Sequence, residues 1–180
     1  MSTNDIGIDP ATPGDLPDLL RAFGQETYFR RQLTRQAEAR GVLLVARQST
    51  RVVGDVYLWL EPKEEPELEE AFPGVPLITH LEVVPDRRRR GIGSAIMGHI
   101  ESRLTERGCK QVVLGLDPAN AIARRFYETL GYLEWTQGAL QTTKEIFLSS
   151  GGVRREEEVC HVFYKDLVSA RLSVHAGDRP

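Results

Sequence analysis

The residues best suited to chemistry lie where an apolar segment, residues 77–84, gives way to arginines and glycines. The run reads Arg87-Arg88-Arg89-Arg90-Gly91-Ile92-Gly93-Ser94 and leads into a helical pattern. The first backbone N–H groups of a helix have no partner within the helix and attract phosphates. Glycines let an anion approach the backbone closely, and arginines add charge-assisted hydrogen bonds. The segment therefore predicts a binding site for a pyrophosphate group.

Other interpretations of this segment are open. A dinucleotide-binding turn needs a third glycine where this chain has Ile96, and it places its glycines directly after the strand, whereas residues 85–90 intervene here. A P-loop needs Gly-Lys-Ser/Thr, which is absent. Short basic runs also occur in nucleic-acid patches, in sorting signals and at ordinary solvated helix starts. The turn alone does not decide the ligand.

A second informative segment, residues 120–132, follows the strand that is expected at residues 111–116. It reads Asn120-Ala121-Ile122-Ala123-Arg124-Arg125-Phe126-Tyr127-Glu128-Thr129-Leu130-Gly131-Tyr132. The pattern Arg88-x-x-Gly91-x-Gly93 after an apolar strand resembles the acyl-CoA-binding motif of the GNAT superfamily of N-acyltransferases. The second segment is similar to that family's other signature, an Asn before a helix, a Tyr within it, then Leu-Gly-aromatic. The resemblance spans residues 6–167, and the order of the expected elements agrees with it.

The resemblance implies acetyl-CoA as the acyl donor, no metal, and a primary amine of a small molecule or peptide as the acceptor, attacking directly in a ternary complex. Backbone amides from Arg88 to Ser94 would bind the pyrophosphate. Backbone groups of Val83 and Val84 would pair with the pantetheine arm and polarise the thioester carbonyl. The donor-binding residues implied in this way are Leu81, Val83, Val84, Arg88, Arg89, Arg90, Gly91, Ile92, Gly93, Ser94, Asn120, Ala123 and Tyr127.

Tyr127 matches the position of the family's usual general acid. The leaving group is a thiolate whose parent thiol has a pKa of about 8.5 by analogy with cysteine. A tyrosine hydroxyl near the sulfur can hydrogen-bond to it or protonate it. Without the resemblance, Tyr127 would simply flank the predicted core residue Phe126. Asn120 would cap its helix and also touch the CoA arm.

The acceptor amine must lose a proton, because an alkylamine with a pKa of about 10.4 is neutral in only about one molecule in a thousand near pH 7. Strand alternation places His80, Glu82 and Val84 on one face. Glu82 is the first candidate for the base, acting directly or through a water, and His80 is the second. Each is otherwise a satisfied polar residue at a strand end, and some family members use no dedicated side-chain base.

The acceptor's identity is not encoded in a recognisable motif. Glutamates crowd residues 61–70 and could attract a cationic amine, while Tyr57 and Trp59 could offer an aromatic surface. A solvated loop and ordinary sheet packing explain both features more simply. Residues 139–157 exceed what a minimal fold needs and would shape the acceptor pocket or a dimer contact. A homodimer is compatible with the resemblance, but nothing in the sequence requires it.

The composition narrows the class of protein. The chain has 180 residues, enough for one domain with its own core, and a net charge of −3, which disfavours a generally cationic nucleic-acid binder. Cys109 and Cys160 belong to no His/Cys cluster, so neither a disulfide scaffold nor a structural zinc site is expected. The N-terminus lacks the features of a signal peptide and no apolar run could span a bilayer, so we expect a cytoplasmic protein without membrane contact.

The expected elements alternate between strands and helices. Strands are expected at residues 6–9, 42–48, 51–60, 77–84, 111–116, 132–137 and 159–167. Helices are expected from Thr12 to Phe23, over residues 25–40 as a mostly surface helix, from the glycine turn to residue 107, and after Asn120. Ile92, Ile96, Ile100 and Leu104 form one buried stripe, and Ile122, Phe126 and Leu130 another. Along residues 51–60, Val52, Gly54, Val56, Leu58 and Leu60 share a face.

The prediction is one α/β domain with the GNAT-like fold over residues 1–168, followed by a flexible tail, residues 169–180. Its mixed central sheet is splayed between the fourth and fifth strands and carries helices on both faces. The predicted function is an acetyl-CoA-dependent N-acetyltransferase. Two alternatives are a non-catalytic acyl-CoA-binding or sensor module on the same fold, and a nucleic-acid binder that uses the arginine run, which the net charge disfavours.

Overall fold

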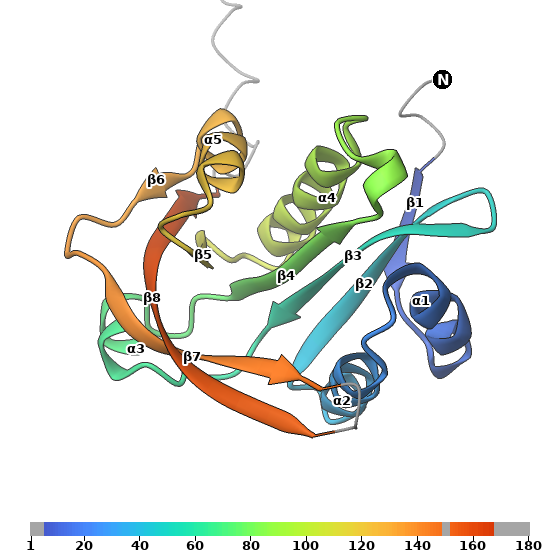
Figure 1. Ribbon diagram of the computed structural model, residues 1–180. Helices are drawn as coiled ribbons and strands as arrows, with labels where there is room; N and C mark the ends of the chain where they lie inside the picture. Colours follow the sequence, from blue (N-terminus) through green and yellow to red (C-terminus); the bar gives the residue numbers. More distant parts are fainter. Residues whose placement is uncertain (1–5, 149–151, 168–180) are drawn as a thin grey trace, which may run out of the picture.

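Apolar strands build the centre of the protein. The computed structural model describes residues 6–148 and 152–167. The strands follow the order β1-β2-β3-β4-β5-β8-β6, and β7 pairs with β8 beside this path (Figure 1). They are β1 (Ile6–Pro10), β2 (Gly41–Gln48), β3 (Arg51–Trp59), β4 (Leu77–Val83), β5 (Gln111–Leu116), β6 (Leu133–Glu134), β7 (Leu140–Phe147) and β8 (Val153–Asp166). The pairs are antiparallel except for β4 with β5, so the sheet is mixed as predicted.

β4 and β5 are paired only where both strands are close to their starts. The parallel register joins Leu77 to Val113 and Ile78 to Leu114, and among the described residues it goes no further. Beyond Ile78 one edge of β4 is therefore free of sheet partners. The predicted splay between the fourth and fifth strands is confirmed.

Helices cover both faces of the sheet, as predicted (Figure 1). They are α1 (Leu16–Phe23), α2 (Glu26–Ala37), α3 (Pro66–Ala71), α4 (Ile92–Glu106) and α5 (Ala121–Thr129), with 3-10 turns at Pro13–Asp15 and Pro85–Arg87. The stripe of α4, from Ile92 to Leu104, is at most 1% exposed and packs on one face. Leu19 of α1 and Phe29 of α2 pack on the other face against β2 and β3. Burial of these two apolar stripes holds the layers together.

Helix α2 is more buried than its polar sequence suggests. We predicted a mostly surface helix, but Tyr28, Phe29, Gln32 and Arg35 are all buried. The reason lies in a distant part of the chain. Residues 139–157, for which no element was predicted, belong to a long hairpin of β7 and β8 that runs from Leu140 opposite Cys160 to Phe147 opposite Val153.

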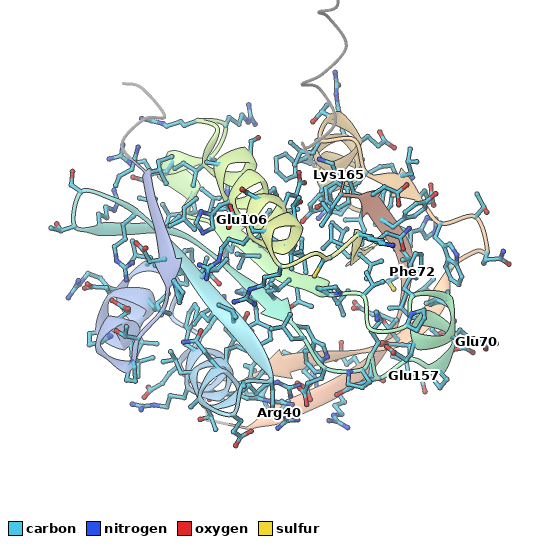
Figure 2. The ribbon with its side chains drawn as sticks, turned by 180° about the vertical axis from the view of Figure 1, so that it is seen from behind. Arg40, Glu70, Phe72, Glu106, Glu157 and Lys165 are labelled. Atoms are coloured by element: carbon cyan, nitrogen blue, oxygen red, sulfur yellow. The ribbon has the colours of Figure 1, made fainter. Side chains whose placement is uncertain are left out.

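The hairpin reaches across to α2 and encloses its polar side (Figure 1). Arg31 of α2 pairs with Glu145 of β7 at 2.5 Å. The rings of Tyr28 and Phe147 meet edge to face with centroids 5.5 Å apart. At the other end of the hairpin, Phe72 after α3, which Figure 2 labels, packs against Trp135 and Tyr164. The hairpin, α2 and the segment around α3 therefore form one continuous wall in front of β4.

Bulges shift the expected side-chain alternation in β3 and β4. The β2–β3 register changes beside Ala46, and the β3–β4 register changes between Asp55 and Tyr57. Because a bulge adds one residue to a strand, the side chains on either side of it fall on opposite faces from those expected. Val52 accordingly packs with the α1–α2 layer, and Val53 takes its place in the core beneath α4, so the predicted face for Val52 is wrong.

The predicted stripe of α5 is wrong at Ile122, which is 84% exposed. Phe126 and Leu130 are partly buried and pack against the core, and the buried residue of this helix is Tyr127. The following strand is shorter than predicted and comprises Leu133–Glu134. The last strand, β8, begins at Val153 rather than near residue 159. The predicted tail at residues 169–180 lies outside the described residues. In the described part of the chain, no helix has the length and apolar character needed to cross a bilayer.

Candidate active site

A cleft of about 710 Å³ lies where the arginine–glycine turn meets α5. The predicted donor-binding residues that line it are Leu81, Val83, Arg88, Arg89, Gly91, Ile92, Gly93, Ser94, Asn120, Ala123 and Tyr127. Arg87, Ile122 and Phe126 also line it, and the sequence analysis did not include them. Arg90 and Val84 do not line it. We call this space the donor cleft.

The floor of the donor cleft is the N-terminus of α4. Gly91 caps the helix with a left-handed φ of 78°, and no side chain caps it. The first helical bond runs from the Ala95 amide to the Gly91 carbonyl. The amides of Ile92, Gly93 and Ser94 have no hydrogen-bond acceptor among the described residues, and a side chain at Gly93 would meet the ring of Phe126 at 3.2 Å. Three such donors at the positive end of a helix dipole fit a diphosphate.

The four arginines of residues 87–90 differ in their contacts. Arg88 donates through Nε to the Val83 carbonyl at 2.9 Å, which ties the turn to the end of β4. Arg87 approaches Asp86, which is itself held by both guanidinium nitrogens of Arg51 at 2.9 and 3.0 Å. Arg87, Arg88 and Arg89 face the donor cleft, whereas Arg90 does not. Sequence spacing alone could not separate these positions because all four residues are arginine.

The free edge of β4 presents Leu81 and Val83 to the donor cleft, but not Val84. The Val84 amide donates to the Val53 carbonyl at 3.0 Å, and its carbonyl accepts from Arg87 at 2.9 Å. Its side chain is 3% exposed and belongs to the core. The predictions that Val84 offers backbone groups to a ligand and shares a face with His80 and Glu82 are therefore wrong. Because successive residues of a strand direct their backbone groups to opposite edges, those of Val83 face the opening.

Tyr127 lies at the inner end of the donor cleft. The Asn120 side chain accepts a hydrogen bond from the Ala123 amide at 3.0 Å and so caps the helix that carries Tyr127. The Tyr127 ring packs edge to face against Phe126 and Tyr132, which fixes its orientation. Burial raises the pKa of Tyr127 to about 12, so its hydroxyl keeps its proton throughout the physiological pH range.

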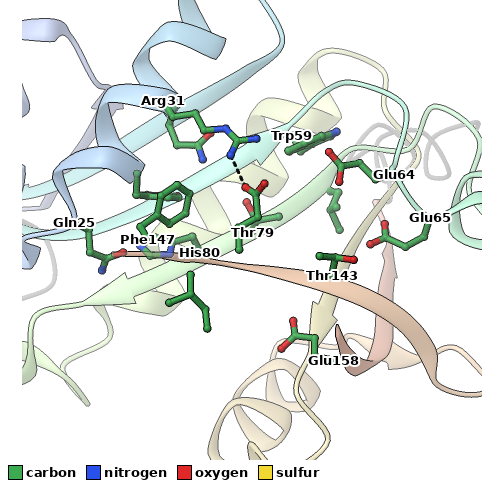
Figure 3. A pocket seen from close by; sticks show the side chains of 15 residues that line it. Gln25, Arg31, Trp59, Glu64, Glu65, Thr79, His80, Thr143, Phe147 and Glu158 are labelled. Atoms are coloured by element: carbon green, nitrogen blue, oxygen red, sulfur yellow. Dashed lines mark hydrogen bonds and ion pairs between the residues drawn. The ribbon is translucent and has the colours of Figure 1, made fainter. Parts of the chain in front are cut away.

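A second cavity, of about 600 Å³, lies on the other side of β4. We call it the acceptor cavity. Figure 3 shows its walls, with Gln25 and Arg31 from the α2 side, Thr79 and His80 from β4, and Thr143 and Phe147 from β7. A smaller space of about 260 Å³ shares Leu81 and Tyr127 with the donor cleft, and Thr79, His80 and Thr143 with the acceptor cavity. The splay between β4 and β5 thus joins the two sides at Tyr127.

His80 and Glu82 lie together, but only His80 lines the acceptor cavity. His80 Nε2 is 3.5 Å from Glu82 Oε2 and 3.6 Å from Oδ1 of Asp55. Glu82 also accepts from Gln25 Nε2 at 3.1 Å and forms part of none of the three cavity walls. His80 has a left-handed φ of 54°, and its ring stacks on Tyr28 with centroids 4.1 Å apart. Such strained, packed geometry at a cavity wall is typical of functional residues.

Asp55 was missed by the sequence analysis because its contacts with β4 depend on the bulge. It is fully buried, and neither carboxyl oxygen accepts a hydrogen bond within the described residues. Burial, reinforced by the charge of Glu82, raises the pKa of Asp55 well above its usual value. Burial also lowers the pKa of His80 to about 4, so its imidazole is neutral near pH 7. One possible ligand atom from each of the three side chains lies within 4.8 Å of the others, so the group can share a proton or a cation.

Asp55→Asn is expected to stabilise the protein, and more so as the pH rises. When the pKa of a carboxyl is higher in the folded than in the unfolded state, the free energy of unfolding begins to fall as the pH rises past the unfolded pKa of about 3.9. The fall is complete above the folded pKa, and the neutral amide does not show it. Each unit by which the pKa is raised adds about 1.4 kcal/mol, or about 4 °C in melting temperature for a chain of this size. Thermal unfolding from pH 4 to pH 9 measures the difference, and a constant difference would show that Asp55 titrates normally.

Comparison with known proteins shows the family of the chain. Residues 13–132 match the family model described as "Acetyltransferase (GNAT) family". The chain is 43% identical over 54 residues, 30% of its length, to mycothiol acetyltransferase from Thermobispora bispora. It is 37% identical over 57 residues, 32% of its length, to the [ribosomal protein bS18]-alanine N-acetyltransferase of Escherichia coli. These matches span 18% and 38% of the two curated relatives.

The fold is shared with solved structures. A GNAT family acetyltransferase from Elizabethkingia anophelis with acetyl-CoA bound superposes with a TM-score of 0.61 at 17% identity. The alignment covers 92% of this chain and all of that one. At this level of identity the likeness supports the fold.

Proposed function

Because the chain belongs to the acetyltransferase (GNAT) family, we propose that it transfers an acetyl group from acetyl-CoA to a primary amine of a small molecule or peptide. The observation that carries the proposal is the junction of two cavities at Tyr127, one lined by helix N-terminal amides and arginines and the other by carboxylates and aromatic rings. Such a passage brings two substrates together from opposite faces of one sheet. Direct attack of the amine needs no covalent enzyme intermediate in this arrangement.

The donor cleft has the groups that an acyl-CoA needs. The amides of Ile92, Gly93 and Ser94 would hold the pyrophosphate, with Arg87, Arg88 and Arg89 at the rim. The amide of Val83 at the free edge of β4 would pair with the pantetheine arm, since the Val83 carbonyl already accepts from Arg88. Bound there, acetyl-CoA supplies an acetyl group activated as a thioester. An amide at this edge would stabilise negative charge on the carbonyl oxygen.

Tyr127 acts as the general acid in this proposal. Its hydroxyl donates a hydrogen bond or a proton to the sulfur as the carbon–sulfur bond breaks. Because burial raises the pKa of Tyr127 to about 12, the residue stays protonated until the thiolate forms. The same feature makes it a poor base, so the amine proton must leave by another route.

His80 is the side chain best placed to receive the amine proton. Its Nε2 faces Asp55 and Glu82, which leaves Nδ1 as the ring nitrogen turned away from the two carboxyl groups. Because burial lowers the pKa of His80 to about 4, the imidazole would not keep this proton: Nδ1 would take it up while Nε2 passes its own proton to Glu82 Oε2, 3.5 Å away. Glu82 then acts through His80 or through Gln25 rather than on the amine itself. The sequence analysis placed Glu82 first, whereas the geometry favours His80.

Binding of acetyl-CoA provides the test of this function. A ligand at about 100 times its Kd adds about 2.7 kcal/mol of stability, which raises the melting temperature by roughly 5–10 °C for a chain of this size. We expect this shift with acetyl-CoA and none with NADH. Release of CoA in the presence of a panel of amines then measures turnover.

The competing functions give different results in the same experiment. A sensor module would be stabilised by acetyl-CoA yet release no CoA with any amine. A nucleic-acid binder would show salt-dependent binding to DNA or RNA that persists at saturating CoA. An unchanged melting temperature with acetyl-CoA would overturn the donor-site assignment.

A further inference from the structure

We propose that Asp55, His80 and Glu82 form a zinc-binding site, and that a zinc ion bound there inhibits the enzyme. The inhibition rests on the proposed acetyl transfer, whereas the site rests on the arrangement of the three side chains. One possible ligand atom from each of them lies within 4.8 Å of the others. Asp55 belongs to β3, and His80 and Glu82 belong to β4, so two paired strands fix their positions. We call this group the β3–β4 cluster.

The spacing of the β3–β4 cluster fits a tetrahedral ion. His80 Nε2 is 3.6 Å from Oδ1 of Asp55 and 3.5 Å from Oε2 of Glu82. An ion about 2.1 Å from each ligand, as zinc is from nitrogen and oxygen, holds its ligand atoms roughly 3.4 Å apart. The ring nitrogen and the two carboxylates therefore need little movement to provide three of the four ligands, and water can provide the fourth.

Asp55 is a buried carboxyl group without a counter-charge of its own. Its side chain is fully buried, and neither oxygen accepts a hydrogen bond from the described residues. Its cross-strand partner is Glu82, and like charges directly opposite each other destabilise a sheet. Among the ion pairs of the described residues, the basic partner of both carboxyl groups is His80. Burial of an unpaired carboxylate is costly, and a bound cation would remove that cost.

His80 and Glu82 are oriented before an ion arrives. The His80 ring stacks on Tyr28, and its buried Nε2 has no hydrogen-bond partner among the described residues. Gln25 donates to Glu82 at 3.1 Å, as outer partners of metal-binding carboxylates do. The side chains of His80 and Glu82 are 24% and 33% exposed, so an ion can reach the cluster from solvent.

The ligand types favour zinc over the common hard cations. Magnesium and calcium prefer six or more oxygen ligands, whereas an imidazole nitrogen combined with carboxylates suits zinc. Two carboxylates also balance the charge of one divalent ion. The occupied site would be neutral, which favours its burial between β3 and β4.

Zinc would block the proposed base without acting as a cofactor. The ion would take the lone pair of His80 Nε2, so the imidazole would carry its proton on Nδ1. Nδ1 would then have no lone pair for the amine proton, and Glu82 would be engaged by the ion. Because none of the three residues lines the donor cleft, acetyl-CoA would still bind.

Calorimetric titration of EDTA-treated, dialysed protein with Zn²⁺ tests the site. We expect one ion per chain and no comparable binding of Mg²⁺. At about 100 times its Kd, Zn²⁺ should raise the melting temperature by roughly 5–10 °C. Asp55→Asn keeps the shape of the side chain and should raise the Kd at least about tenfold, since loss of an outer partner alone has an effect of that size. This variant is expected to be more stable than the parent, so weaker binding cannot be ascribed to unfolding.

Glu134→Gln is the matched control. It removes a carboxylate from a different histidine–carboxylate pair, the one with His161, which lies outside the β3–β4 cluster. Its Kd for Zn²⁺ should equal that of the parent. Equal binding by Asp55→Asn and the parent, or equal weakening in Glu134→Gln, would overturn the site, and Mg²⁺ binding as tight as that of Zn²⁺ would overturn the choice of ion.

Initial rates of amine acetylation test the inhibition. Mass spectrometry of the acetylated amine is the suitable measurement, because the thiol of released CoA itself binds zinc. With free Zn²⁺ buffered at about ten times its Kd, the rate should fall about tenfold, and excess EDTA should restore it. The Kd for acetyl-CoA should not change. An unchanged rate in zinc-saturated protein would overturn the inhibition.

The outcomes separate this inference from the proposed function. If the metal-free protein acetylates an amine but binds no zinc, the inference fails and acetyl transfer stands. If the metal-free protein acetylates no amine, the proposed function fails and the inhibition fails with it. The calorimetric titration decides the zinc site in either case, because it requires no turnover.

Discussion

Replacing Tyr127 with phenylalanine should lower kcat by about 10²- to 10³-fold while leaving the Kd for acetyl-CoA unchanged. Tyr127 lines both the donor cleft and the small space that adjoins the acceptor cavity, and its ring, which packs against Phe126 and Tyr132, remains in the variant. The variant therefore loses the proton-donating hydroxyl but keeps the ring that packs in the core. Single-turnover kinetics together with calorimetric titration of acetyl-CoA measure the two quantities separately.

Tyr132→Phe is the matched control for this prediction. It deletes a hydroxyl from a buried ring 5.7 Å away that lines neither cavity. Its kcat should stay within about twofold of the parent, because no reacting atom is near it. The pKa of Tyr127, raised to about 12 by burial, also predicts no loss of kcat from its ionisation up to about pH 10. A Tyr127→Phe enzyme as fast as the parent would remove Tyr127 from the mechanism.

The second large effect is expected at Ser94, where an aspartate should abolish tight donor binding. Ser94 is the third residue of α4, is exposed and lines the donor cleft. A carboxylate there would occupy the helix N-terminus in place of the pyrophosphate and repel it by about 2–4 kcal/mol. We expect the Kd for acetyl-CoA to rise about 30-fold or more. Titration at low and high salt measures the change.

Ser94→Asn provides the neutral control of nearly the same shape. Because aspartate is favourable in the first turn of a helix, Ser94→Asp should fold with an unchanged or raised melting temperature, so weakened binding cannot be ascribed to unfolding. The repulsion should shrink at 1 M salt, where charges separated by more than about 3 Å are screened. Equal Kd values for the Asp and Asn variants would place the pyrophosphate elsewhere.

Local sequence signals predicted most of the framework. The helix expected from Thr12 does begin there, where Thr12 and Asp15 form a capping box with the Thr12 amide donating to Asp15 at 2.7 Å. Gly24 and Gly131 end their helices with φ of 75° and 84°, as turn chemistry predicts. The stripe of α4 has the expected burial because a helix packed on a sheet keeps its period. These features depend on residues that are close together in the sequence, so they can be predicted from a single sequence without knowledge of the fold.

The remaining features depend on contacts between distant segments. Ile122 has the spacing of a core residue, yet it borders the donor cleft because α5 turns Tyr127 towards the sheet. The bulges that bring Asp55 to His80 and turn Val84 into the core have no local signature. The role of α2 as a cavity wall depends on the hairpin of β7 and β8, whose polar sequence carries no clear alternation.

The donor and acceptor sides of the protein are encoded in largely separate stretches of chain. Residues 81–127 build the donor cleft, whereas Thr143, Glu145, Ile146, Phe147 and Glu158 of the hairpin close the acceptor cavity. The family match, residues 13–132, ends before the hairpin begins. Substrate choice can therefore diverge in evolution by changes in β7 and β8 while use of the donor is inherited intact.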